Sequence, residues 1–163
     1  MLEQAVRELR GEPAETEIEP ELQLGIPAYI PETYIPDVSQ RLMVYKRMAG
    51  IRGVPDLDAI AAELVDRYGP LPPLVDTLLR VMELRRWLKD LRIGRARRRG
   101  DSVVLEFDTT TPVSTETLLS SIRGSRGRLR MAGSSAIEIR AVASDHDGLI
   151  AELREHLQKL AAA

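Results

Sequence analysis

Two groups of charged side chains are the places where this sequence could do chemistry. The first is the trio Glu63, Asp66 and Arg67, which lies in a segment with helical periodicity. At about 100° per residue, the apolar stripe of that helix includes Leu57 and Leu64, and the trio points outward within a sector of about 100°. Glu63 and Arg67 also form an i,i+4 pair, worth only about 0.3–0.5 kcal/mol on a solvated face. The trio is therefore either such a face or a rigid set of charges that docks on a partner.

The second group is an arginine cluster between Arg92 and Arg99. Gly100-Asp101 is typical of the turn of a β-hairpin. One face of the first strand then carries three arginines: Arg95, Arg97 and Arg99. In this register Arg95 opposes Glu106, and Gly94 opposes Phe107. The arginines either contact phosphate groups or form a solvated face that discourages pairing between sheet edges.

Patterns typical of catalysis or metal binding are absent from the sequence. It contains no Gly-x-x-x-x-Gly-Lys-Ser/Thr phosphate loop, no Gly-x-Gly-x-x-Gly motif and no Gly-x-Ser-x-Gly nucleophile elbow. The only histidines, His146 and His156, do not have metal-ligand spacing. Because there is no cysteine, disulfides, Cys-ligated zinc and thiol catalysis are excluded. We therefore expect no catalytic residue, no cofactor and no metal site.

The composition is that of a folded domain. The chain has 163 residues, of which 44% are hydrophobic and 29% are charged, with a formal net charge of −2. A domain of this size buries roughly 70% of its unfolded surface, so a real core is expected. The near-neutral balance argues against a general nucleic-acid coat, although it leaves room for a local basic patch. No apolar run approaches the ~20 residues that cross a bilayer, and we expect a cytoplasmic protein without membrane contact.

The first 37 residues of the chain are predicted to form three segments. Residues 1–11 have the periodicity of an amphipathic helix that ends at Gly11. Residues 12–25 are acidic, contain two prolines and are predicted to be a linker. Residues 26–37, the proline segment, repeat Tyr-Ile-Pro and should run extended over the domain, with their side chains packed on it. The alternative for this segment is a recognition peptide for a partner.

Three helices are predicted next. The first begins at Asp37 and buries a stripe that includes Val38 and Leu42. The second is capped by Asp56 and buries a face that includes Val65. The third is longer, begins at two prolines and is apolar around much of its circumference. We expect this third helix to be the central helix of the core.

The period of the apolar residues changes after Gly94. The hairpin over residues 95–107 is followed by a short helix, a second pair of strands over 128–131 and 136–141, and a C-terminal helix. The predicted fold class is α+β: a compact single domain whose helical first half is followed by short β-hairpins with packed helices.

Several motifs occur in a distinctive order through the first half of the chain. They are Ala28-Tyr29-Ile30-Pro31, Tyr34-Ile35-Pro36-Asp37, Gln40-Arg41, Tyr45-Lys46-Arg47 and the run from Glu63 to Pro72. This order resembles the C-terminal domain of the bacterial transcription-repair coupling factors. The resemblance extends from about Leu2 to the last helix and is looser from Arg95 onward. It implies that residues 1–11 are the tail helix of a preceding helicase-like motor and that residues 26–163 are the C-terminal α+β domain.

The resemblance implies a regulatory function. In that family an ATP-driven DNA translocase displaces stalled RNA polymerase and recruits the excision-repair protein UvrA through a UvrB-like module. The C-terminal domain, which is not itself an enzyme, packs on that module and masks the UvrA-binding surface. The family's Glu-Leu-x-Asp-Arg motif maps its contact residues onto Glu63, Asp66 and Arg67, and DNA is bound by the motor. The alternative is an accessory nucleic-acid-binding module centred on Arg92 to Arg99.

Overall fold

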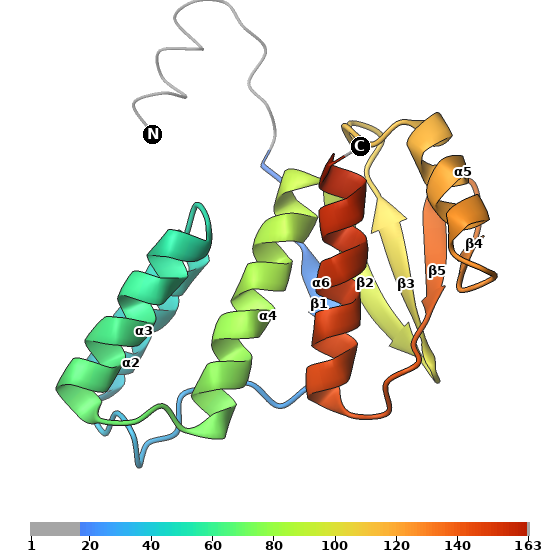
Figure 1. Cartoon of the computed structure of the whole chain (residues 1–163). Helices are drawn as coiled ribbons and strands as arrows, with labels where there is room; N and C mark the ends of the chain where they lie inside the picture. Colours follow the sequence, from blue (N-terminus) through green and yellow to red (C-terminus); the bar gives the residue numbers. More distant parts are fainter. Residues whose placement is uncertain (1–16, 163) are drawn as a thin grey trace, which may run out of the picture.

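The computed structural model describes residues 17–162, so the helix expected over residues 1–11 lies outside the described part of the chain. Figure 1 shows a helical part beside a sheet, with α4 between them. The helices are α2 (Val38–Ala49), α3 (Val54–Tyr68), α4 (Pro73–Asp90), α5 (Thr115–Gly124) and α6 (His146–Ala162). The α+β fold class predicted from the sequence is confirmed, with the helical half first along the chain.

The proline segment packs on the helical part as predicted. Ile30, Tyr34 and Ile35 are buried in the core that α2 and α3 share. The Tyr34 hydroxyl lies 3.0 Å from the carbonyl oxygen of Leu64 and 2.9 Å from that of Gly69, where α3 ends. The extended segment is therefore part of the hydrophobic core that supports α3.

Helix α2 buries a different face from the one that the sequence predicts. Its capping is as expected, since the Asp37 carboxylate accepts a hydrogen bond of 2.9 Å from the backbone N–H of Gln40. Val38 and Leu42 were expected in the core, but they are 59% and 62% exposed. The helix instead buries Val44 and Met48.

The proline segment explains this rotation of α2. Arg41 donates a hydrogen bond of 2.7 Å to the carbonyl of Ile35. The hydroxyl of Tyr45 accepts one of 2.7 Å from the backbone N–H of Ile30. These contacts turn the Arg41 and Tyr45 side of the helix toward the segment. Val38 and Leu42 lie further around the helix and therefore face solvent.

Helix α3 also departs from the prediction in two places. It begins at Val54, and Asp56 lies in its first turn, where its carboxylate accepts a 2.7 Å hydrogen bond from the backbone N–H of Arg52. Val65 was expected on the core side but is 46% exposed. The buried stripe is the narrower set Leu57, Ile60 and Leu64. The outward surface of α3 is therefore wider than periodicity predicted.

Helix α4 joins two hydrophobic cores. Its first half buries Val75 and Leu78 among the side chains of the helical part. Its second half buries Leu84 and Leu88 against the sheet. The longest predicted helix is therefore central, as expected. Among the residues that the structure describes, no helix has both the length and the apolar character to span a membrane.

The sheet has five strands in the order β1-β2-β3-β5-β4. They are β1 (Glu21–Gln23), β2 (Ile93–Arg99), β3 (Ser102–Phe107), β4 (Leu129–Met131) and β5 (Ala136–Arg140). Strand β1 runs parallel to β2, and the other neighbours are antiparallel. The linker predicted over residues 12–25 needs correction here, because β1 lies within it and Leu24 is buried in the sheet core. The three residues of β1 form a strand because they pair with the longer β2, and their own composition does not predict a strand.

The arginine hairpin has nearly the predicted register. Arg95 faces Glu106 across the pair, as expected. Phe107, however, pairs with Ile93, and the register shifts between Ile93 and Arg95. The prediction that Gly94 opposes Phe107 is therefore wrong, because Gly94 is the extra residue of an irregularity where glycine is common.

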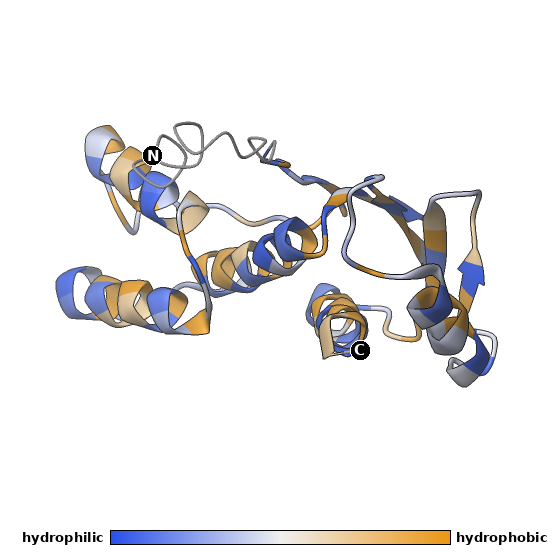
Figure 2. Cartoon of the chain, turned by 90° about the horizontal axis from the view of Figure 1, so that it is seen from above, coloured by the Kyte–Doolittle hydropathy of each residue, from blue (hydrophilic) through white to orange (hydrophobic). Residues whose placement is uncertain are grey.

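One face of the sheet is covered by helices. Leu88 of α4, Ile122 of α5 and Leu153 of α6 all pack on the same core. Viewed from above, these three helices lie on one side of the sheet (Figure 2). The side chains of Arg97, Glu138 and other outward positions point to the opposite face. That face is not covered by any helix of residues 17–162.

Candidate functional site

The sequence-predicted trio lies on the outer side of the α2–α3 pair. We call Arg47, Glu63, Asp66 and Arg67 the charged ridge. Glu63 accepts from Arg47 of α2 at 2.6 Å and from Arg67 of its own helix at 3.4 Å. The hydrogen bond from Arg47, with the smaller effect of Arg67, lowers the pKa of Glu63 below its usual range. Glu63 therefore stays ionised under mildly acid conditions and joins two helices electrostatically.

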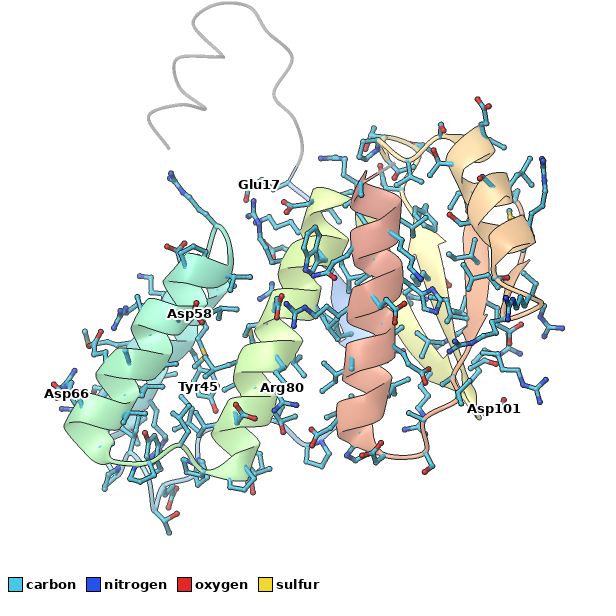
Figure 3. All side chains as sticks on the ribbon, viewed as in Figure 1. Glu17, Tyr45, Asp58, Asp66, Arg80 and Asp101 are labelled. Carbon is cyan, nitrogen blue, oxygen red and sulfur yellow. The ribbon has the colours of Figure 1, made fainter. Side chains whose placement is uncertain are left out.

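Asp66 differs from Glu63 in its surroundings. It is exposed, and within the described residues it makes no ion pair. Figure 3 shows its side chain at the outer side of α3, far from α4. An exposed carboxylate without a protein partner keeps its full capacity to accept hydrogen bonds from another surface.

Arg67 is held from two directions. Besides Glu63, its guanidinium lies over the ring of Tyr68, 5.2 Å from the ring centroid. Tyr68 in turn donates a 2.7 Å hydrogen bond to Gln40 of α2, and its ring lies 5.8 Å from that of Tyr34. The end of α3 is thus braced against both α2 and the proline segment. This bracing fixes the position of Arg67 while leaving its side chain 51% exposed.

Arg47 is the ridge residue that sequence reasoning missed. It lies sixteen residues before Glu63, on another helix, so helical periodicity cannot connect the two. One signal in the sequence could have found it: Arg47 belongs to the Tyr45-Lys46-Arg47 motif. Gln40, which accepts the hydrogen bond from Tyr68 beside the ridge, likewise belongs to the Gln40-Arg41 motif.

The ridge is a charged surface without a cluster of metal-ligating side chains among its described residues. The ridge has two arginines and two carboxylates, so it carries no net charge, and Glu63 lies between Arg47 and Arg67. Within residues 17–162, no group of three or more His, Cys, Asp or Glu side chains could hold a metal ion. Charges of both signs on rigid helices suit recognition of a complementary protein surface better than binding of a polyanion.

The three predicted hairpin arginines share one sheet face but differ in their partners. Arg95 lies 3.2 Å from Glu21 of β1 and 3.7 Å from Glu106 of β3. Arg97 and Arg99 make no ion pair within the described part of the chain. The Nε atom of Arg97 is buried and has no hydrogen-bond partner among the described residues. The structure therefore neutralises Arg95 and leaves the excess positive charge nearer the hairpin turn.

The described elements of this chain form an α+β domain with two separate charged surfaces, one on the α2–α3 pair and one on the sheet. Residues 24–118 match the family model of the TRCF domain. The transcription-repair-coupling factor of Myxococcus xanthus is 43% identical over 93 residues, which is 57% of this chain and 8% of that protein. That of Bacillus subtilis is 34% identical over 106 residues, 64% of this chain and 9% of the relative. That of Escherichia coli is 29% identical over 165 aligned positions, 98% of this chain and 14% of the relative.

A solved structure shares the same fold. A crystal structure of the C-terminal domain of a transcription-repair coupling factor superposes with a TM-score of 0.78 and 22% identity, covering 91% of this chain and 95% of that one. The chain belongs to the TRCF domain family of the transcription-repair coupling factors. It spans between 8% and 14% of the three relatives named above.

Proposed function

We propose that this chain is a non-catalytic regulatory domain of a transcription-repair coupling factor. It packs through the charged ridge on a UvrB-like module of the same protein and covers the surface that recruits UvrA. The observation that carries the proposal is the ridge geometry. Glu63 holds Arg47 and Arg67 at fixed positions, and Asp66 has no ionic partner within the described residues. A surface with the reverse order of charges would meet each exposed group with its opposite.

Tethering explains how so small a surface can hold the domain on the UvrB-like module. Two modules of one chain meet at an effective concentration in the millimolar range. A contact with a dissociation constant of about 0.1 mM then keeps the domain closed for about 90% of the time. A ligand that binds only the open form shifts this balance by its difference in affinity between the two forms. Engagement of RNA polymerase by the rest of the protein is the event that we assign to this shift.

The proposal also includes the activity of the full-length parent protein. The parent is an ATP-dependent DNA translocase in the cytoplasm that displaces stalled RNA polymerase, and its motor makes the principal DNA contacts. Support for these assignments comes from membership of the TRCF domain family and from relatives named transcription-repair-coupling factor.

A titration of this domain with the separated UvrB-like module tests the contact directly. We expect weak binding by the wild type and loss of at least tenfold in affinity for Asp66→Arg, since a like charge then faces the partner. The matched control is Asp58→Arg, an exposed aspartate of α3 that lies outside the ridge and has no ion pair within the described residues. Equal affinities for the wild type and Asp66→Arg would show that the ridge is a solvated face only.

A further inference from the structure

A second charged surface lies at the far end of the molecule from the ridge. Figure 3 shows Asp101 at the β2–β3 turn, on the opposite side from Asp66. A hollow of about 270 Å³ opens beside this turn. Its lining residues are Arg99, Asp101, Ser102, Gly127, Arg128, Arg130, Glu138 and Arg140. Four arginines that are dispersed in the sequence thus line one hollow at this end of the sheet.

Strand register brings these arginines together. Arg99 and Arg140 both align with Ser102 of β3, one from each side. Arg130 of β4 pairs with Glu138 of β5, two residues before Arg140. Neighbouring strands lie about 4.8 Å apart, and outward positions on one strand are about 6.8 Å apart. Long guanidinium side chains at these positions can converge on a single group above the hollow.

Positive charge exceeds negative charge around the hollow. Arg140 lies 3.5 Å from Asp101, and Arg130 is paired with Glu138. Arg128 lies 3.3 Å from Glu152 of α6. Arg99 has no ion pair within the described residues, and neither has Arg97 next to it on the same face. The two carboxylates that line the hollow therefore face more guanidinium groups than they can neutralise.

The chemistry of the lining indicates what kind of partner fits. Every lining side chain is charged or hydroxylated, and Gly127 has none. Protein partners usually bury an apolar anchor at the centre of an interface. Interfaces with nucleic acids are more polar and more positively charged. The six aromatic residues of the chain all lie outside this hollow, so it offers no platform on which bases could stack.

We propose that this hollow binds a backbone phosphate of a nucleic acid, with Arg99, Arg130 and Arg140 as the guanidinium donors. The planar fork of arginine matches the geometry of phosphate oxygens. Without stacking or base contacts, binding is weak, independent of sequence and dependent on salt in proportion to the number of phosphates contacted. The site lies apart from the charged ridge and does not depend on the proposed regulatory function. The proposed site differs from the basic patch predicted from the sequence. It leaves out Arg95, which Glu21 and Glu106 neutralise, and adds Arg130 of β4 and Arg140 of β5.

Fluorescence anisotropy of the full chain with a labelled DNA duplex tests this proposal at several salt concentrations. We expect the triple change Arg99→Ser, Arg130→Ser and Arg140→Ser to weaken binding at least tenfold. The slope of log Kobs against log salt should fall by about 1 if one phosphate contact is lost. Asp101→Asn should tighten binding two- to threefold, because it frees Arg140 from its carboxylate. Thermal melting checks that the triple variant is folded, and Arg140→Ser alone is the substitute if it is not.

The control removes three exposed charges elsewhere: Arg52→Ser, Arg80→Ser and Lys159→Ser. It has the same net charge as the triple variant, and we expect it to change the affinity less than twofold. Absence of salt-dependent DNA binding by the wild type would overturn the proposal. An equal loss in the control and the triple variant would overturn it too, as would preferential binding of an acidic peptide at the same arginines.

Discussion

The buried hydroxyl of Tyr34 should stabilise the end of α3 that carries the charged ridge. Its single proton can be donated to the carbonyl of Leu64 or to that of Gly69, at 3.0 and 2.9 Å. Gly69 ends α3 with a φ of +92°, a conformation that favours glycine, so its carbonyl lies beyond the regular helical hydrogen bonds. Tyr34→Phe removes the donor and leaves the ring in place.

The expected cost follows from these contacts. A net hydrogen bond contributes about 0.5–1.5 kcal/mol, and a buried acceptor left unpaired costs about 1–3 kcal/mol. The carbonyl of Gly69 is only partly buried, and that of Leu64 lies within α3, so a loss of about 1–1.5 kcal/mol is expected. For a domain of this size, that loss lowers the melting temperature by about 3–5 °C.

Thermal denaturation of Tyr34→Phe beside Tyr29→Phe measures this effect. Tyr29 is 51% exposed, so its hydroxyl should matter little and its variant should melt with the wild type. Hydrogen exchange supplies a local readout, because the amides of residues 66–69 should exchange faster in Tyr34→Phe. If Tyr34→Phe melts within 1 °C of the wild type and these amides keep their protection, the hydroxyl does not anchor α3.

Three further outcomes are expected. Burial, followed by the charges of Arg128 and Lys159, lowers the pKa of His156. The unfolded chain then takes up the proton more readily than the folded one, so the free energy of unfolding decreases as pH falls below about 6.5. Urea melts should show a smaller decrease for His156→Gln. Burial raises the pKa of Tyr34 above 10.0, so urea melts should show stability lost as pH rises above that value, less so in Tyr34→Phe. The purified chain should hydrolyse no nucleotide in a phosphate-release assay, and activity that persists through two orthogonal columns would contradict this.

The sequence carried enough information for the order of elements and for part of the ridge. Periodicity placed Glu63, Asp66 and Arg67 on one outward sector, and the structure has Glu63 and Arg67 in contact there. Turn chemistry at Gly100-Asp101 predicted the hairpin and the pairing of Arg95 with Glu106. These features depend on residues that are close in sequence, where spacing and geometry are directly linked.

Three of the missed features depend on distant contacts. Strand β1 exists because β2 offers a free edge, more than sixty residues later in the chain. Val38 and Leu42 face solvent because the proline segment occupies the other side of α2. Arg47 reaches Glu63 only through the packing of two helices. Local pattern cannot predict such choices, because tertiary packing overrides propensity.

The most direct test of the regulatory account is UvrA binding by the full-length parent protein. Reversing Asp66 and Arg67 to Arg and Asp should leave the domain folded, because both side chains are exposed. Loss of an interface hot spot costs at least about 2 kcal/mol, or roughly thirtyfold in the balance between closed and open forms. The reversed protein should therefore bind UvrA nearly as well as a version that lacks residues 26–163. UvrA binding as weak as that of the wild type, with unchanged melting, would contradict the account.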